Sequence, residues 1–467
     1  MVKAHLRASR FAPREKGGDR TGIVFFPAFD WAISPTHPER EERLLYTRDQ
    51  LFEEGVMDLP QILEYQPRLA DLKDIARVHF CVPSIEAQIT EAHLVAVGGA
   101  LVMADAVINQ EVKNGFALVR PPGHHAMRVA HGNRGFCNIN NEPIMVEYLR
   151  KKYGIRKIAI VDTDVHHGDG TQDVFWHDPD VLFISFHQDG RTLYPGSGFI
   201  NEMGGPLALG TTLNIPLPPG TTDEGIHYVL DNLVLPVLDK FEPELVVNSA
   251  GQDNHYTDPL ANMRFSAQGY ATLNEKLAPD IAVLEGGYSV ETALPYVNMG
   301  IIMAMAGIDY SNLYEPDYNE NRFRESEERL GRLERIIDEL RVIFDNREAL
   351  VEAARQKYDQ FYQTSRNIFY DTDYIHEQQQ EMLRMCPDCP GYGAIDSQGA
   401  YRDGTGSRVY CISIPMYGCP RCQQDATELY EKMMAQSDGR FDIVYLQDRM
   451  TDVYRQYNFN TGKERVL

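Results

Sequence analysis

The chain has few cysteines and few basic residues for its 467 residues, and both shortages argue against whole classes of protein. Its seven cysteines are odd in number and unevenly spread, which suits a reducing cytosol better than a disulfide framework. Lysine and arginine total 45 against 68 acidic residues, a formal net charge of −23. A nucleic-acid-binding protein should carry a basic face, so direct binding of nucleic acid is not expected. The acidity is compatible with a cationic substrate, although an acidic surface more often serves solubility.

Membrane segments and several common hydrolase motifs are also missing. The first 20 residues are polar and basic, so we expect a disordered N-terminus without a signal peptide, and a cytoplasmic protein. The longest apolar run, 94–104, is too short to span a bilayer and fits a buried helix. The absence of His-Glu-x-x-His, Walker and Gly-x-Ser-x-Gly motifs argues against the common metalloprotease, nucleotide-hydrolase and serine-hydrolase mechanisms.

The chain contains instead a series of short apolar runs that end in polar, glycine-flanked residues. These runs predict buried strands at 22–26, 116–119, 157–161, 181–186, 245–249 and 281–284. Helical stretches lie between them, such as 86–109, 223–240 and 266–277. Strands that alternate with helices predict an α/β fold with a mostly parallel sheet. Ligands bind at the carboxyl ends of such strands, so the polar residues there should converge.

The densest strand end is Asp162-Thr163-Asp164-Val165-His166-His167-Gly168-Asp169-Gly170-Thr171. Alternate residues of a strand point to one side, so Asp162, Asp164 and His166 should project together. A carboxylate and an imidazole in one crevice form half of a metal site; the plain alternative is a polar turn with capping acids. Asp253, just past another strand end, is the candidate third ligand or, alternatively, a helix N-cap.

Three ligands and a water make a catalytic zinc site, in which the metal lowers the pKa of water to about 7 and polarises a carbonyl. The adjacent His124 and His125 are the candidate acid/base pair. Asp162 and Asp169 are free to orient them through hydrogen bonds. Tyr288, after two glycines, could donate a hydrogen bond to a developing oxyanion, typically worth about 3 kcal/mol, or it could be an ordinary turn residue.

Several motifs together resemble the zinc-dependent histone deacetylase and acetylpolyamine amidohydrolase superfamily, and are most similar to its class II and bacterial deacetylase-like branch. In chain order they are Arg120-Pro121-Pro122-Gly123-His124-His125, Gly135-Phe136-Cys137-Asn138, the 162–171 motif, Tyr194-Pro195-Gly196, Asp258-Pro259-Leu260 and Leu284-Glu285-Gly286-Gly287-Tyr288. The resemblance covers about 22–307 and implies the arginase-like α/β fold, here with a C-terminal helical and zinc-ribbon-like extension.

The resemblance also implies roles for individual residues. Zinc is bound by Asp164, His166 and Asp253; His124 and His125 act as general acid/base with Asp162 and Asp169; Tyr288 polarises the amide carbonyl. A structural potassium would use Asp162, Asp164, His166, Ser185 and Phe186. Substrate would meet Gly135, Phe136, Tyr194, Leu260 and Gly287, with Phe136 and Tyr194 as tunnel walls. Arg40, in His37-Pro38-Glu39-Arg40 at the start of a charged helix, resembles the arginine beneath the active site that is associated with acetate release.

The implied activity is removal of acetyl, or another acyl group, from the side-chain amine of acylated lysine in a peptide or protein. Acetylated polyamines and other small acetylamines are the second interpretation, and a catalytically inactive scaffold is the third. Leu260, where polyamine-specific relatives often carry glutamate, favours lysine, while the nearby Asp258 weakens that inference. Gln252, Asn254-His255-Tyr256 and Tyr194 depart from the usual pattern and leave the acyl-chain preference open.

The tail changes composition at about residue 312. Leu330, Leu333, Ile337, Leu340 and Phe344 follow a coiled-coil spacing, which also fits a helix packed on the catalytic domain. Cys386-Pro387-Asp388-Cys389 and Cys419-Pro420-Arg421-Cys422 predict a structural zinc site; the alternative is a redox pair. This region could hold the tail together, form a homo-oligomer or grip a partner.

These patterns divide the chain into a disordered N-terminus (1–20), a deacetylase-like catalytic domain (21–310), a helical extension (311–380) and a four-cysteine, zinc-ribbon-like domain (381–467).

Overall fold

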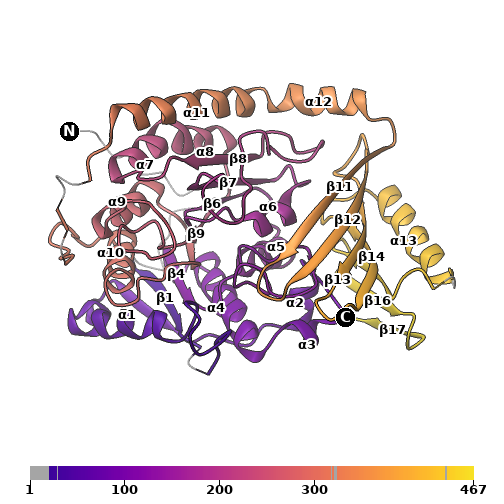
Figure 1. The fold of residues 1–467 in the computed structure, drawn as a ribbon, viewed down its shortest axis with the longest axis horizontal. Helices are drawn as coiled ribbons and strands as arrows, with labels where there is room; N and C mark the ends of the chain where they lie inside the picture. Colours follow the sequence, from indigo (N-terminus) through magenta and orange to yellow (C-terminus); the bar gives the residue numbers. More distant parts are fainter. Residues whose placement is uncertain (1–19, 29, 317, 320–322, 437–438) are drawn as a thin grey trace.

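The computed structural model describes residues 20–28, 30–316, 318–319, 323–436 and 439–467 (Figure 1). The expected disorder of residues 1–20 therefore falls almost entirely outside the described residues. The larger part of the fold is built on an eight-stranded sheet, and all of its strand pairs are parallel. In sheet order the strands are β2 (Ile62–Tyr65), β1 (Thr21–Phe26), β4 (Asn114–Val119), β10 (Ile281–Leu284), β9 (Leu245–Ala250), β6 (Ile158–Asp162), β7 (Val181–Gln188) and β8 (Thr212–Leu217).

Helices cover both faces of this sheet, because its buried strands send alternate side chains into two separate cores. Ile23 lies in one core and Val24 in the other, and Phe116 and Ala117 divide in the same way. The first core is closed by α1 (Glu42–Glu53), α7 (Asp223–Val229), the π-helical turn Leu230–Val234, α8 (Leu235–Phe241), α9 (Ala267–Leu277), α10 (Leu294–Ala306) and α11 (Glu327–Asp345). The second is closed by α2 (Leu72–Ala76), α3 (Ile85–Gln88), α4 (Glu91–Ile108), α5 (Asn141–Tyr153) and α6 (Asp169–Phe175).

The predicted strands are all present, and the α/β fold with a mostly parallel sheet is confirmed. Helix α4 is the one helix among the described residues that is long and apolar enough to cross a membrane. It is 67% buried and packs against β1 and β4, as a core helix does. The interpretation of its apolar run as a buried helix is therefore confirmed.

Helix α11 packs on the sheet of its own chain. Leu333, Ile337, Leu340 and Phe344 are buried in the first core, so the heptad spacing reflects packing on the catalytic region. Of the two alternatives for this spacing, the structure shows packing within the chain. Figure 1 shows α11 and the following α12 (Arg347–Lys357) lying end to end along one side of the molecule, leading to the C-terminal sheet.

The C-terminal region forms a second sheet of seven strands, accompanied by the helix α13 (Pro420–Ala435). Its strands, in sheet order, are β11 (Phe361–Tyr370), β12 (Ile375–Arg384), β13 (Gly393–Ala400), β14 (Gly406–Ile414), β15 (Ile443–Asp448), β16 (Val453–Asn458) and β17 (Lys463–Val466). One face packs on α13, through residues such as Ile412 and Val444. The other face packs on the short strands β3 (Phe80–Cys81) and β5 (Val129–Ala130) of the catalytic region.

This sheet corrects the expected limits of the helical extension. Helix α12 ends at Lys357, the following residues to 380 are mostly strand, and the expected boundary at 380/381 falls inside β12. The segment 375–384 is rich in glutamate and glutamine, which favour helix. It is a strand because its inward polar side chains find fixed partners: Glu377 accepts from Tyr370 at 2.8 Å and Glu381 from Arg128 at 2.6 Å. Tertiary contacts outweigh helix propensity here.

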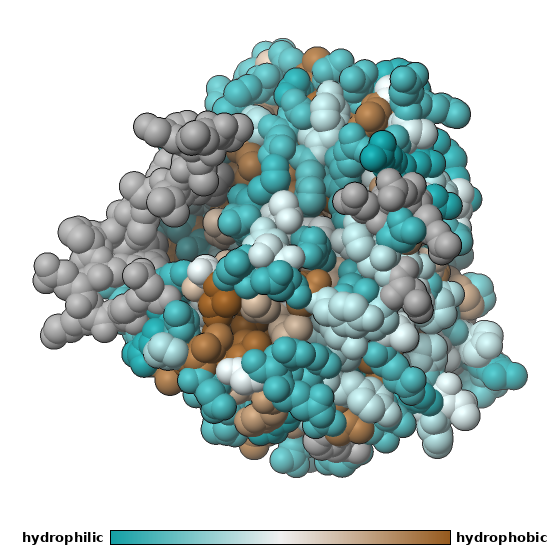
Figure 2. Space-filling view, turned by 90° about the vertical axis from the view of Figure 1, so that its left-hand side faces the viewer, coloured by the Kyte–Doolittle hydropathy of each residue, from teal (hydrophilic) through white to brown (hydrophobic). Residues whose placement is uncertain are grey.

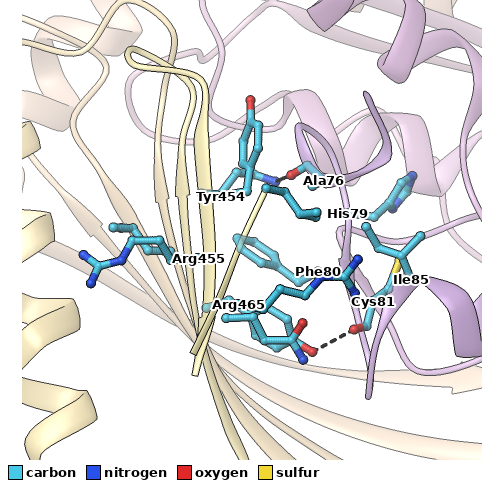
Figure 3. Close-up of a pocket in the computed structure, with 13 residues that line it drawn as sticks. Ala76, His79, Phe80, Cys81, Ile85, Tyr454, Arg455 and Arg465 are labelled. Carbon is cyan, nitrogen blue, oxygen red and sulfur yellow. Dashed lines mark hydrogen bonds between the residues drawn. The ribbon is translucent and has the colours of Figure 1, made fainter. Parts of the chain in front are cut away.

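Residues from both parts of the molecule meet closely where the C-terminal sheet contacts the catalytic region (Figure 3). Tyr445 donates to the Cys81 carbonyl at 2.7 Å, and Gln447 donates to the Ala76 carbonyl at 2.7 Å. The cavity beside these contacts is about 30 Å³, room for one or two water molecules. The opposite side of the molecule, which carries α1 and α10, is mainly hydrophilic with one compact group of hydrophobic residues (Figure 2).

Candidate active site

The predicted site residues follow adjacent central strands. Strands β4, β10, β9, β6 and β7 are parallel neighbours, so the loops after them leave the sheet at the same edge. Asp162 of β6 is paired in register with Ser249 of β9 and with Ser185 of β7. Residues that are widely separated in sequence therefore come together at one edge of the sheet.

Asp164, His166 and Asp253 form a compact group of metal-ligand type, with one ligand atom of each lying within 4.8 Å of the others. His166 Nδ1 lies 3.0 Å from Asp164 Oδ1 and 3.1 Å from Asp253 Oδ2. Burial disfavours a charged imidazole, but the two carboxylates raise the pKa of His166 to about 10. Two buried carboxylates beside one imidazole nitrogen leave an excess of negative charge. This donor set fits a divalent cation such as zinc.

Two glycines leave the space that these carboxylates occupy. A Cβ on Gly251 would lie 2.1 Å from Asp164 Oδ2, and one on Gly286 would lie 2.2 Å from Asp253 Oδ2. The Gly286 N–H also donates to Asp164 Oδ2 at 2.7 Å. Any larger residue at either position would displace a carboxylate of the group.

His124 and His125 lie beside this group, and each is held by its own carboxylate. His124 Nδ1 is 3.1 Å from Asp162 Oδ2, and His125 Nδ1 is 2.8 Å from Asp169 Oδ1. The two rings are 4.1 Å apart. Burial opposes charge on His124, but the carboxylates of Asp164 and Asp162 raise its pKa to about 10. Burial and the neighbouring positive charge hold the pKa of His125 well below its ordinary value. Two adjacent histidines whose pKa values are shifted in opposite directions are suited to moving a proton.

Aromatic rings surround the acid/base pair. Tyr194 meets His125 edge-on at 5.1 Å between centroids, and Phe136 meets Tyr288 at 5.7 Å. Burial raises the pKa of Tyr288 well above its ordinary value, although Arg43 opposes this, so its hydroxyl is available as a donor. These contacts place both predicted wall residues beside the predicted catalytic residues.

The remaining predicted site residues lie at or beneath this edge. Gly287 adopts φ +123°, a conformation open to glycine. Leu260 is half-buried, and its backbone N–H is held by Asp258. Ser185 and Phe186 are buried on β7, where the Ser185 hydroxyl lies 2.9 Å from His187 Nδ1.

The expectation that Arg40 lies beneath the active site is wrong, because Arg43 occupies that position. Arg40 precedes α1, is 39% exposed and pairs with Glu42. Arg43 lies on the inner face of α1 and is fully buried, donating to the carbonyls of Gly287 at 2.8 Å and Glu285 at 2.6 Å. The motif marks the right turn, but the helix that begins at Glu42 turns Arg43 inward.

Arg43→Ala is expected to lower the free energy of unfolding by about 2–4 kcal/mol, because it leaves two buried carbonyls without a donor, while Glu39 keeps its pair with Arg120. Arg40→Ala is the matched control, expected to change stability by less than about 0.5 kcal/mol. Urea unfolding of both variants measures the difference. Equal losses for the two arginines would contradict the assignment.

Three further residues support the site through contacts that sequence reasoning did not predict. Glu285 accepts hydrogen bonds from the backbone N–H groups of Gly123 at 2.8 Å and His124 at 3.1 Å. Asp258 accepts from the Tyr288 N–H at 2.7 Å. Arg134 pairs with Asp169 at 2.5 Å. Glu285 and Asp258 lie within recognised motifs, which was the available signal; Arg134 precedes its motif by one residue.

The four cysteines of the paired knuckles form a second group of metal-ligand type. Their sulfurs lie within 4.8 Å of one another, at the start of α13 and in the loop after β12. The Cys386 and Cys419 sulfurs are 3.8 Å apart. A tetrahedral zinc with bonds of about 2.3 Å would separate its sulfurs by about 3.8 Å, whereas a disulfide would join them at about 2.05 Å. The arrangement fits a four-cysteine zinc site.

Comparison with known proteins bears on the whole site. Residues 83–301 match the family model described as "Histone deacetylase domain". A "Probable deacetylase" of Archaeoglobus fulgidus is 46% identical over 325 residues, which cover 64% of this chain and 89% of the relative. "Polyamine deacetylase HDAC10" of Danio rerio is 33% identical over 270 residues, covering 55% of this chain and 38% of the relative. The solved HDA15 HD domain superposes with a TM-score of 0.61 at 26% identity, covering 73% of this chain and 98% of that domain.

Proposed function

The chain belongs to the histone deacetylase family, and from this we propose that it is a zinc-dependent amidohydrolase of acylated lysine. It would remove acetyl, or another acyl group, from the side-chain amine of lysine in a peptide or protein. One observation carries the proposal: Asp164, His166 and Asp253 meet next to two histidines that each have a carboxylate partner. A scaffold with an inactive site has no need to keep all of these groups in working geometry.

Bound at Asp164, His166 and Asp253, zinc would supply Lewis acidity toward the amide carbonyl and lower the pKa of water. His124 and His125 each bond a carboxylate through Nδ1, which leaves Nε2 of each ring to accept or deliver a proton. Tyr288 remains protonated and would donate to the carbonyl oxygen as negative charge develops there. Together these residues would convert an amide into a carboxylate and a free amine.

The lysine stem would pass between Phe136 and Tyr194, whose rings lie beside Tyr288 and His125 respectively. Four methylene groups bury favourably between aromatic rings, while the ammonium end is present only as a neutral amide. The carbonyl of Gly135 would accept from the substrate amide, and the backbone at Gly287 and the side chain of Leu260 would complete the entrance. These assignments rest on the resemblance and on the positions of the residues.

The position of Asp258 supports lysine over small acetylamines. Both of its carboxylate oxygens accept backbone hydrogen bonds, from Leu260 and Tyr288. Burial and the nearby Asp253 also raise the pKa of Asp258 to about 7. A carboxyl group that is turned inward and already holds two backbone N–H groups is a poor partner for a distal ammonium. The relative from Danio rerio, named a polyamine deacetylase, is the observation that favours the second interpretation.

The kcat/KM for an acetyl-lysine peptide is expected to exceed that for an acetylated polyamine by at least about tenfold, equivalent to 1.4 kcal/mol in transition-state binding. Both substrates are measured with one zinc-loaded preparation, and release of acetate is the common readout. The reverse preference would assign the enzyme to small acetylamines. Turnover of neither substrate would favour the scaffold interpretation.

We further propose a structural zinc at Cys386, Cys389, Cys419 and Cys422, and a potassium ion near Asp162, Asp164, His166, Ser185 and Phe186. The sulfur spacing supports the first, and the register of Asp162 with Ser185 supports the second. Seven unpaired cysteines support a cytoplasmic location. The C-terminal sheet remains a candidate surface for a homo-oligomer or a partner.

A further inference from the structure

The turn between β11 and β12 reaches the candidate active site from outside the matched deacetylase domain. The match ends at residue 301, whereas this turn spans 371–374. Asp371 Oδ1 accepts hydrogen bonds from the Tyr194 hydroxyl at 2.9 Å and from the Gly135 N–H at 2.9 Å. Both donors belong to the proposed lysine passage. A single carboxylate oxygen of the C-terminal sheet therefore holds two sides of that passage.

The same hairpin also contacts Arg134, which pairs with the carboxylate partner of His125. Arg134 Nε donates to the carbonyl of Phe369 at 3.1 Å, and its guanidinium lies 5.5 Å from the centre of the Tyr194 ring. Arg134 also pairs with Asp169, which lies 2.8 Å from His125. The hairpin thus contacts Tyr194, which packs against His125, and Arg134, which pairs with the carboxylate partner of His125.

The packing around Gly135 leaves no room for a side chain at this position. Gly135 has φ +53°, and a Cβ there would lie 2.4 Å from His125 and 2.9 Å from the Tyr194 hydroxyl. The next residue, Phe136, has φ +71°, which is unfavourable for a residue with a side chain and needs support from its surroundings. The bond from the Gly135 N–H to Asp371 is one such support.

We propose that Asp371 is a positioning residue for deacylation, acting through Tyr194 and Gly135 to hold the passage in its substrate-binding shape. The C-terminal sheet is then part of the active site. The proposal rests on the proposed function for the identity of the substrate. Phenylalanine at position 194 would remove one of the two hydrogen-bond donors to Asp371. The effects of substitutions at Tyr194 and Asp371 should therefore depend on each other.

A purely structural explanation would make Asp371 an ordinary docking contact, and the hairpin offers a matched control for it. Asp373 Oδ2 accepts from the Asn133 N–H at 2.6 Å. This bond also joins a hairpin carboxylate to a backbone N–H of the 133–137 loop. Within the part of the chain that the structure describes, Asp373 makes no hydrogen bond to Tyr194 or to Gly135. A purely docking role would therefore predict the same behaviour for both aspartates.

The test measures KM and kcat of the full-length, zinc-loaded protein on an acetyl-lysine peptide. Asp371→Ala is expected to raise KM about tenfold, as expected for loss of a charge-assisted hydrogen bond, with kcat changed less than about threefold. Asp371→Asn should stay within about threefold of wild type, because its amide oxygen can still accept both bonds. Tyr194→Phe with Asp371→Ala should cost less than the product of the single effects. Asp373→Ala should lower the melting temperature without raising KM.

Equal rises in KM for Asp371→Ala and Asp373→Ala, or no rise for Asp371→Ala, would overturn the proposal. Binding separates it from the proposed function. Calorimetric Kd values for the same peptide are compared in His124→Ala protein with and without Asp371→Ala. If Asp371→Ala weakens peptide binding but the wild-type enzyme does not turn the peptide over, the proposed function is refuted and the positioning role of Asp371 is retained. If the wild-type enzyme turns the peptide over but Asp371→Ala leaves KM and Kd unchanged, the function is retained and the role of Asp371 is refuted. If the peptide is neither bound nor turned over, both proposals are refuted.

Discussion

The His124→Ala protein is expected to hydrolyse an acetyl-lysine peptide about 10²- to 10⁴-fold more slowly than wild type, the usual contribution of a general acid or base. Its zinc content should stay unchanged. His124 bonds Asp162 through Nδ1, and its Nε2 lies 3.8 Å from Asp164, so it is next to the ligand group without belonging to it. The measurements are kcat and bound zinc per chain on the same sample.

Asp253→Ala provides the contrast, because it removes a proposed ligand. That variant should lose activity together with about one zinc per chain, whereas His124→Ala should lose activity alone. An unchanged kcat in His124→Ala would defeat its acid/base role. Loss of zinc in His124→Ala would show that the ring, or the loop it holds, belongs to the metal site.

The sequence was sufficient to predict the central strands of the parallel sheet. Strands such as β6 and β9 are short apolar runs buried on both faces, and this pattern is easily recognised. The strands that were not identified, β2 and β8, are the two edges of the sheet. β2 has only four residues, and β8 carries Asn214 and Pro216, so neither shows a continuous apolar run.

The candidate site divides in a similar way. The residues at strand ends were predicted because several chemically distinctive side chains occur in a short motif. Asp162 ends β6, and Asp164 follows it in the bend after the strand. Arg40 was assigned in place of Arg43, because a motif gives the turn but not the rotation of the helix after it. The contact between Tyr194 and Asp371 joins residues 177 positions apart, and no local pattern marks it.

The C-terminal sheet shows the limit of local propensity most clearly. The cysteine knuckles could be read from their spacing, and their sulfurs do come together. The strand conformation of the Gln- and Glu-rich segment β12 could not be predicted from its own sequence. It depends on partners such as Arg128 and Ser397 that lie elsewhere in the chain. Buried polar groups with fixed partners override the preference of their own segment.

Cys386→Ser is expected to release about one of two zinc ions per chain and to lower the melting temperature. A structural zinc contributes directly to folding energy, and a four-cysteine site that lacks one thiolate binds it much more weakly. Asp388→Ser is the matched control, because Asp388 is an exposed residue of the same turn between Cys386 and Cys389. That variant should keep both metals and the wild-type melting temperature. Full zinc content in Cys386→Ser would refute the site.

The same variant should also affect catalysis, although its zinc site is separate from the active site. Cys386 lies two residues after the end of β12, and the other end of that strand begins just after the turn that carries Asp371. Loosening the sheet should therefore weaken the hold of Asp371 on Tyr194 and Gly135. KM should rise toward the value of Asp371→Ala, while kcat and the catalytic zinc are retained. If KM is unchanged after the sheet has lost its zinc, the hairpin is held by its contacts with the catalytic region alone, chiefly Arg128 with Glu381 and Asn133 with Asp373.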